Sequence, residues 1–295
     1  MDYIVESQMR YEKERYFSNS IEYDLAISYL QGYCAQFVAK CVNAKRKVMF
    51  FHGSTDDHHE LHEKIMENFS SIYCVSVGAL KEMQKYYPQF SSKMKCLENI
   101  VDVMQVRSAA KAFSVNKPQD KLVLCSCGRF AYAKGFDIAV ETAKILKEKD
   151  LQFIWYFVGD GPERASLEQT IAQYGLNDRI VMAGMQSNPY PFMENCDIYV
   201  QPSREESQGL TMIEAQILCR PIISTCTIGG MSLINEGVNG FLTDINATAL
   251  AHSISYLAKN AKLKASMEQY MRTLDYSEAK CVFKKKWAEL LGDGK

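Results

Sequence analysis

The segment "CDIYVQPSREESQGLTMIEA", residues 196–215, connects a short apolar run to a helix-like pattern through a polar loop. The run CDIYVQP is typical of a strand that is buried on both faces of a parallel sheet. Two carboxylates, Glu206 and Glu214, lie on either side of Gly209, where we expect the helix to begin. The segment therefore predicts one strand-loop-helix unit with acidic side chains at its loop.

Both glutamates also match a purely local pattern. Residues 203–206 and 211–214 each fit the capping box, in which a Ser or Thr is followed three residues later by Glu. Capping does not explain the glycine between the two acids, whereas backbone N–H groups near Gly209, Leu210 and Thr211 can bind an anion. We favour an anion-binding loop in which both glutamates accept hydrogen bonds from hydroxyl groups, with capping as a second role for Thr211.

Similar units flank this segment on both sides. Short apolar runs at residues 121–128, 152–159, 179–184, 221–225 and 240–244 alternate with helical patterns. We expect a doubly wound α/β domain over residues 106–275. Residues 1–105 contain about three strand candidates, at 23–30, 47–53 and 70–77, which predicts a partial Rossmann-like domain. Residues 276–295 predict a C-terminal helix that packs back on this N-terminal domain.

A second loop with candidate ligand-binding residues is "GRFAYAKG", residues 128–135. Gly128 ends a strand, and Arg129 and Lys134 follow in the loop. Arginine can bind two oxygens at once and lysine acts as a point charge, so the pair suits a diphosphate. The spacing is neither a Walker loop nor G-x-G-x-x-G, and taken alone the loop favours a solvated basic surface. Since ligands of open parallel sheets bind at the carboxyl ends of strands, we expect both loops at one site.

Two more loops follow strands of the same domain. "VGDGPERA", residues 158–165, favours a tight turn with Asp160 as a cap over ligand contact. "AGMQSNPYPF", residues 183–192, begins where a strand ends at Gly184. It suits either a border for a flat aromatic base, beside Met185, or a connection stiffened by Pro189 and Pro191.

Composition excludes several classes of protein. The chain of 295 residues has 34 basic and 35 acidic residues and a net charge of -1, which is no signature of a nucleic-acid binder. Its 10 cysteines include no C-x-x-C pair, so we expect a reduced, cytoplasmic protein. No signal-peptide pattern and no apolar run of membrane-spanning length is present.

Two clusters have alternative interpretations. His58 and His62 are four residues apart, a metal-compatible spacing, but no third ligand is evident and we expect no metal. The segment "FKKKWAELL", residues 283–291, is basic and amphipathic. We favour a helix that packs on the N-terminal domain over a peripheral membrane contact at the inner face of the membrane.

Taken together, "GRFAYAKG", "VGDGP", "PSREESQGLTMIEA", "PIIST" and "GVNGFL" resemble, in order and spacing, the retaining glycosyltransferases of family four. Glu206 and Glu214 match the E-x(7)-E pattern of that family, and "NPYPF" resembles members that build capsule or exopolysaccharide. The resemblance is strong over residues 120–245. It implies the GT-B fold, which has two Rossmann-like domains facing a cleft, and a hexosyltransferase-type activity.

The resemblance assigns roles to particular residues. Arg129 and Lys134 match the pair that binds the donor diphosphate, Glu214 matches the ribose ligand, and Glu206 matches the residue near the donor sugar hydroxyls. His52 matches a strand-end histidine that faces the donor sugar, whereas a lone histidine would otherwise be structural. The predicted catalytic residues are Glu206, Arg129, Lys134 and His52. The predicted donor-binding residues are Gly128, Arg129, Lys134, Gly184, Met185, Ser207, Gln208, Gly209, Leu210, Thr211 and Glu214.

The implied reaction moves a sugar from a nucleoside diphosphate sugar, with a UDP-sugar favoured, to a saccharide or lipid-linked saccharide without a metal cofactor. Ser207 and Gln208 depart from the glycine and phenylalanine that are common in the family. The family's opening strand, glycine-rich loop and helix have no counterpart here. An upstream piece or a partner chain would then complete the N-terminal domain, and a non-catalytic nucleotide-sugar-binding subunit is the alternative function.

Overall fold

The computed structural model describes residues 21–52 and 59–292 of the chain. The chain divides into two compact units. The smaller unit consists of residues 1–99 and 279–295, and the larger unit consists of residues 100–278. The expected limits are residues 105 and 275, and the two units divide after residues 99 and 278. Each unit has its own parallel sheet and its own core.

The larger unit contains a six-stranded parallel sheet in the order β10-β9-β8-β5-β6-β7. All six strands lie within the predicted apolar runs, which confirms those predictions. After β5, β6 and β7 the chain crosses to the other side of β5 to form β8. This reversal of strand order is the topological switch point at which open α/β sheets bind ligands. The strands are β5 (Leu122–Cys127), β6 (Phe153–Val158), β7 (Ile180–Gly184), β8 (Ile198–Gln201), β9 (Ile222–Thr225) and β10 (Gly240–Thr243).

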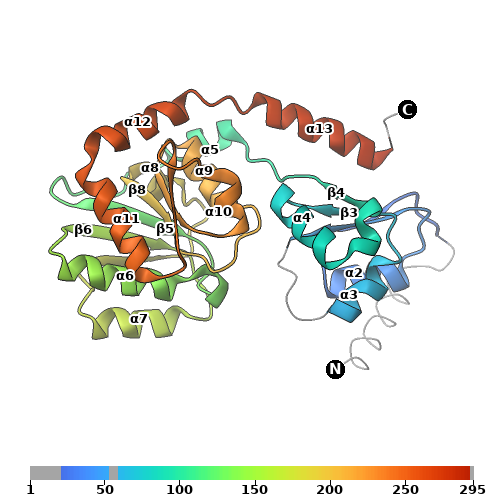
Figure 1. Cartoon of the computed structure of the whole chain (residues 1–295), viewed down its shortest axis with the longest axis horizontal. Coiled ribbons are helices and arrows are strands. Elements are labelled where there is room, and N and C mark those ends of the chain that lie inside the picture. The colour runs from blue at the N-terminus through green and yellow to red at the C-terminus, as the bar shows by residue number, and fades with distance from the viewer. Residues whose placement is uncertain (1–20, 53–58, 293–295) are drawn as a thin grey trace. The chain divides into compact units, whose positions relative to one another are not determined.

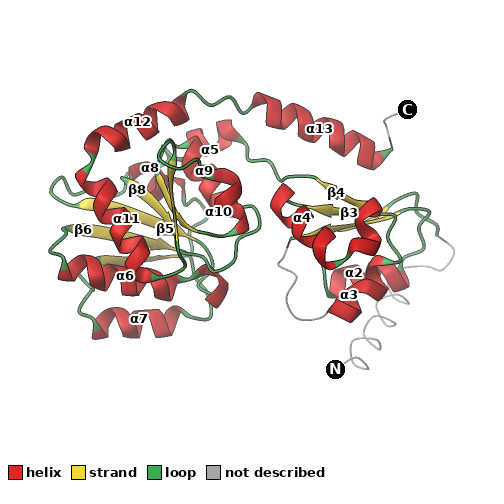
Figure 2. Ribbon diagram, in the orientation of Figure 1, coloured by secondary structure: helices red, strands yellow, loops and turns green. Residues whose placement is uncertain are grey.

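Helices cover both faces of this sheet (Figures 1 and 2). The alternation along β6 shows why: Trp155 and Phe157 enter one core cluster, and Tyr156 and Val158 enter the other. The first cluster lies under α6 (Phe136–Glu148), α7 (Arg164–Gln173), α11 (Ala247–Lys259) and α12 (Ala261–Arg272). The second lies under α5 (Val103–Ala109), α8 (Tyr190–Asn195) and α9 (Leu210–Ile217). The remaining elements are η2 (Tyr132–Lys134) and α10 (Ile228–Leu233).

The smaller unit contains a parallel sheet of four strands in the order β1-β2-β3-β4. The prediction of about three strands missed β4, because this strand is only three residues long and has an exposed lysine, Lys95, at its centre. The strands are β1 (Ala26–Ser28), β2 (Lys47–Phe51), β3 (Ser71–Cys74) and β4 (Met94–Cys96). The helices are α2 (Tyr33–Cys41), α3 (His59–Met66), α4 (Val77–Tyr86) and η1 (Pro88–Lys93).

The C-terminal helix α13 (Ser277–Leu291) packs on this smaller sheet. Its Trp287 ring lies 6.2 Å from the Phe50 ring, and Leu290 is buried against the same cluster. Lys286 donates a hydrogen bond to the carbonyl of Cys96, whereas Lys284 and Lys285 are exposed. The apolar face of α13 is therefore occupied by packing. Within the described residues, no helix has the length and apolar character needed to cross a membrane.

Candidate functional site

The predicted loops of the larger unit meet at the carboxyl ends of β5, β8 and β9. The backbone N–H groups of Arg204 and Glu205, after β8, both donate to the carbonyl of Ala133, after β5, at 2.8 and 3.1 Å. The N–H of Gly229, at the start of α10, donates to the carbonyl of Glu206 at 2.7 Å. Three loops far apart in the sequence thus form one hydrogen-bonded edge at the switch point.

Two glycines permit this close approach. Gly135 has φ +63°, and a Cβ atom on it would lie 2.1 Å from the carbonyl oxygen of Pro202. Gly159 has φ +150°, and a Cβ atom there would lie 1.9 Å from the carbonyl oxygen of Gly128. Neither position can accept a side chain without a backbone shift. "GRFAYAKG" and "VGDGP" are therefore glycine-rich because their backbones lie against neighbouring loops.

Lys134 and Glu206 form an ion pair in this edge, with Nζ and Oε2 2.7 Å apart. Both side chains are largely shielded, with exposed fractions of 30% for Lys134 and 14% for Glu206. Arg129 is exposed, and its guanidinium makes no hydrogen bond or ion pair with the described residues. At this edge Lys134 is therefore paired, and Arg129 is available to an anionic ligand.

Arg204 locks the loop after β8 onto the first turn of α6. Its guanidinium makes two hydrogen bonds to the carboxylate of Asp137, at 2.7 and 2.6 Å, and lies 4.0 Å from the ring centroid of Tyr132. A bidentate pair of this kind fixes orientation as well as distance. In the sequence, Arg204 stands out only as part of a capping pattern.

A buried glutamine, Gln201, connects the core to this ion pair. Its Oε1 accepts hydrogen bonds from Tyr199 Oη and Thr211 Oγ1, at 3.0 and 3.1 Å. Its Nε2 donates to Ser203 Oγ at 2.8 Å and to Glu206 Oε2 at 3.4 Å. All four hydrogen-bonding positions of the amide are filled. Sequence reasoning missed Gln201, although a polar residue at the end of a buried strand was a signal for it.

The capping-box interpretation is wrong for both patterns. Helix α9 begins at Leu210, its N-cap is Gly209 with φ 74° and no side-chain cap, and Thr211 lies inside the helix. Thr211 instead donates its hydroxyl hydrogen to Gln201. Residues 203–206 form a loop after β8 and begin no helix. Both glutamates are therefore available for other roles.

Glu214 lies in the second turn of α9, where it is half-buried. Tyr190 Oη, from α8, donates a hydrogen bond to Glu214 Oε1 at 3.0 Å. Burial raises the pKa of the Glu214 carboxyl, and the Tyr190 hydrogen bond partly offsets this rise. Ser207 and Gln208 are half-buried in the loop before α9, Leu210 is exposed, and Met185 is 79% exposed beside Gly184, which ends β7.

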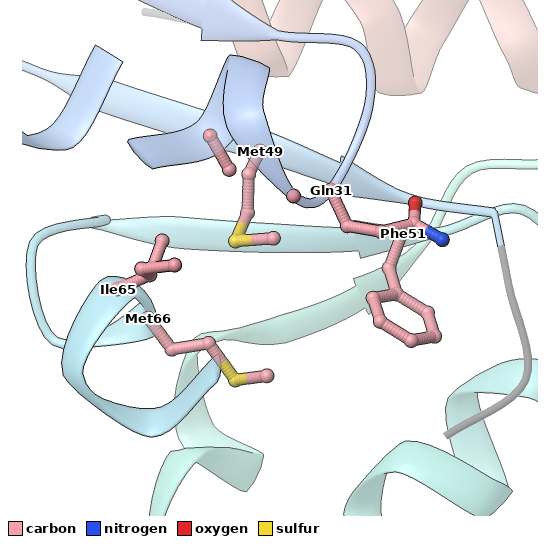
Figure 3. Close-up of a pocket in the computed structure, with 7 residues that line it drawn as sticks. Gln31, Met49, Phe51, Ile65 and Met66 are labelled. Carbon is pink, nitrogen blue, oxygen red and sulfur yellow. The ribbon is translucent and has the colours of Figure 1, made fainter. Parts of the chain in front are cut away.

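His52 lies in the smaller unit, directly after β2. Its backbone N–H donates to Gln31 Oε1 at 3.2 Å, and burial lowers the pKa of its imidazole despite a hydrogen bond with the backbone of Tyr29. A small pocket nearby lies between α2, α3 and the sheet (Figure 3). Its lining is almost entirely apolar, which suits packing better than sugar binding: Gln31, Gly32, Ala35, Met49, Phe51, Ile65 and Met66.

The suggested histidine pair lies outside the residues whose side chains are described. Among the side chains that are described, no group of three or more His, Cys, Asp or Glu residues could hold a metal ion. Cys125 and Cys127 share one face of β5, with their sulfur atoms 3.6 Å apart, and both are buried.

Comparison with known proteins identifies the family. Residues 108–274 match the family model described as "Glycosyl transferases group 1". The chain belongs to this family. The match covers the sheet of the larger unit and the strand-end loops of that unit.

Two curated relatives are lipopolysaccharide core biosynthesis glycosyltransferases of Rhizobium meliloti. The chain is 27% identical to LpsE over 203 residues, which is 68% of this chain and 58% of LpsE. It is 31% identical to LpsD over 211 residues, which is 70% of this chain and 60% of LpsD. The chain therefore spans less than two thirds of the length of either relative.

Solved structures share the fold. Anabaena HepE, in complex with UDP-glucose, has a TM-score of 0.74 at 18% identity over 98% of this chain and 82% of HepE. A TarM variant from S. aureus, in a complex that includes UDP, has a TM-score of 0.71 at 21% identity over 88% of this chain and 53% of TarM. These are GT-B glycosyltransferases, which confirms the predicted fold class.

Proposed function

We propose that the protein is a retaining glycosyltransferase that transfers a sugar from a nucleoside diphosphate sugar to a saccharide or lipid-linked saccharide in cell-surface polysaccharide synthesis. The observation that carries this proposal is the Lys134–Glu206 ion pair beside the start of α9, at the switch point of a parallel sheet. A cation, a carboxylate and the N-terminus of a helix are the groups needed for a diphosphate joined to a sugar.

In the proposed complex, each group of this edge meets one part of the donor. Lys134 and the exposed Arg129 bind the diphosphate, together with backbone N–H groups at the start of α9. Glu206 accepts hydrogen bonds from sugar hydroxyls, and Glu214 accepts them from the ribose. A UDP-sugar is the favoured donor, because the HepE and TarM structures contain UDP or UDP-glucose.

The charge balance explains how this edge would promote transfer. Glu206 neutralises Lys134 at 2.7 Å. A donor diphosphate adds negative charge, which the exposed Arg129 offsets. As the sugar leaves with oxocarbenium character, charge grows on the diphosphate, and the fixed cations stabilise it. The leaving diphosphate then helps to remove the proton of the acceptor hydroxyl, so that the sugar is delivered on the same face.

Two substitutions test this function. We expect Lys134→Ala and Glu206→Gln each to reduce sugar transfer at least about tenfold, because each substitution removes a charged group of the proposed donor site. Transfer or donor hydrolysis is measured with UDP-, GDP- and ADP-sugars and a panel of saccharide acceptors. Lys45→Ala is a matched control, because Lys45 and Asp24 form an ion pair of the same 2.7 Å length on the exposed surface of the smaller unit.

The outcomes separate the proposed enzyme from its alternative. Transfer near the wild-type rate in both variants would contradict the site assignment. Nucleotide binding by the wild-type protein, seen as a thermal shift, without turnover on the whole panel would favour a nucleotide-sugar-binding subunit that works with a partner chain. In that case the two variants would weaken binding and leave no activity to compare.

A further inference from the structure

The segment "NPYPF", residues 188–192, holds Tyr190 in a rigid backbone. Pro189 is the N-cap of α8, and Pro191 follows within the first turn, where it is buried. Proline restricts φ to near −65°, so Tyr190 lies between two restrained residues. The Tyr190 N–H donates to Asn188 Oδ1 at 3.2 Å, and Asn188 Nδ2 donates to the carbonyl of Ala109 in α5 at 2.8 Å. The backbone of Tyr190 is thus fixed from both sides.

The Tyr190 side chain reaches one oxygen of Glu214. Its Oη donates to Glu214 Oε1 at 3.0 Å, which is a charge-assisted bond when the glutamate is ionised. Burial and the nearby Glu214 carboxylate raise the pKa of Tyr190 to about 12, so the phenol remains a donor at neutral pH. Glu214 Oε2 accepts no hydrogen bond from the described residues. One oxygen is held, and the other is available.

We propose that Tyr190 is a positioning residue for the nucleotide: it holds one oxygen of Glu214 so that the other accepts hydrogen bonds from the ribose hydroxyls. The inference rests on the proposed function, in which Glu214 is the ribose ligand. A half-buried carboxylate with a single hydrogen bond could otherwise rotate about its last torsion, which is broad and soft. The Tyr190 hydroxyl removes this freedom before the nucleotide binds, and the two prolines keep the hydroxyl in place.

The test removes one hydroxyl group with Tyr190→Phe. Calorimetry measures the affinity for UDP and for 2′,3′-dideoxy-UDP, which has no ribose hydroxyls. We expect Tyr190→Phe to weaken UDP binding about tenfold, the worth of one hydrogen bond to a charged group. Its affinity for the dideoxy nucleotide should stay within about twofold of wild type, and so should kcat at saturating donor. If Tyr190 only stabilises the fold, Tyr190→Phe should weaken the binding of both nucleotides alike, which would contradict the positioning role.

A matched tyrosine provides the control. Tyr174 Oη donates to Glu141 Oε1 at 2.9 Å on the exposed surface of the same unit, so Tyr174→Phe removes the same kind of bond away from the switch point. We expect this variant to bind both nucleotides as wild type does. Glu214→Gln, in turn, should reduce the preference for UDP over its dideoxy analogue by as much as Tyr190→Phe does.

The pH dependence provides a second readout. Because the ribose is bound by the carboxylate form, UDP affinity falls as the pH drops through the pKa of Glu214. This pKa is already raised by burial, and loss of the Tyr190 hydrogen bond raises it further. Tyr190 is the only titratable group of the described residues that shifts it. We therefore expect Tyr190→Phe to lose UDP affinity at a higher pH than the wild type.

Two results would count against these proposals, and they are distinguishable. Equal UDP affinity and an equal pH midpoint in wild type and Tyr190→Phe would overturn the positioning role and leave the proposed function intact. A wild-type protein that binds no UDP, GDP or ADP would contradict the proposed function itself, and the positioning role with it.

Discussion

At the scale of single residues, Gln201 is the side chain on which the geometry of the edge depends most. It is 3% exposed, and its amide connects Tyr199, Ser203 and Thr211 to the Glu206 carboxylate. The bond to Glu206 is long, at 3.4 Å, and hydrogen bonds of catalytic groups often shorten in the complex with substrate. Gln201 thus fixes the position of Glu206, which forms the ion pair with Lys134.

We expect Gln201→Met to reduce the free energy of unfolding by about 1–3 kcal/mol, because it leaves buried hydroxyl groups without partners. We also expect Gln201→Met to reduce sugar transfer about tenfold in the wild-type protein. In a protein that already carries Glu206→Gln, the same substitution should reduce transfer much less, because the effects of substitutions at contacting residues are not additive. Urea unfolding and transfer assays measure the two effects. Gln216→Met is the control, because Gln216 is buried in α9 outside this hydrogen-bonded chain. Additive effects on transfer would argue against the coupling.

At the scale of elements, the loops after β5 and β8 depend on Gly135. Gly135→Ala combines a left-handed φ of +63° with a clash against Pro202, whereas Gly237, which is left-handed too with φ +74°, has no atom within 4 Å of an added Cβ. We expect Gly237→Ala to cost about 1–2 kcal/mol for the backbone conformation alone, and Gly135→Ala to cost a further ~1–3 kcal/mol for the clash. Denaturant unfolding compares the two variants, and equal costs would show that the loops can separate freely.

At the opposite end of the same sheet, Asp197 connects the start of β8 to β5, to the loop before β5 and to α12. Its carboxylate accepts hydrogen bonds from Lys117 Nζ at 3.0 Å, Lys264 Nζ at 3.3 Å and the Val123 N–H at 2.9 Å. Burial alone would raise its pKa, but the Val123 hydrogen bond and the two lysines lower it below the usual 3.8. A lowered pKa contributes stability above pH 3.8, and this contribution is lost as the pH falls through the folded-state pKa.

We therefore expect Asp197→Asn to be less stable than wild type by about 1–3 kcal/mol at neutral pH, with the difference shrinking below about pH 4. Thermal or urea unfolding between pH 3 and pH 7 measures it. The exposed pair of Asp24 and Lys45 supplies a comparison, and Asp24→Asn should show a smaller effect. A difference that is independent of pH would refute the electrostatic role of Asp197.

At the scale of the whole molecule, the two units have separate hydrophobic cores. Ligand binding at the switch point should therefore act first on the loops of the larger unit. We expect UDP to slow amide hydrogen exchange in residues 128–135 and 203–211, and to leave the α6 and α7 side of the sheet unchanged. Exchange followed by mass spectrometry, with and without saturating UDP, measures this. Protection confined to the smaller unit would place the nucleotide elsewhere.

The sequence by itself determined the strands of the larger unit, the strand-end position of its loops and the family. Apolar runs of five to eight residues between helical patterns are best explained as buried strands, and loops that follow parallel strands must meet at one edge. In the smaller unit the same reasoning missed β4, because a three-residue strand with a central lysine has too few apolar positions to be recognised.

Only the tertiary structure decided how the side chains at this edge pair. The local capping patterns pointed to partners three residues away, but Thr211 bonds Gln201, Glu206 pairs with Lys134, and Glu214 bonds Tyr190. These partners lie 10, 72 and 24 residues apart in the chain. Strand order and register place them together, and no local spacing records that order. The physical reason is that a sheet of parallel strands brings distant loops within hydrogen-bonding distance of one another. Their side chains then pair between loops instead of capping the nearest helix.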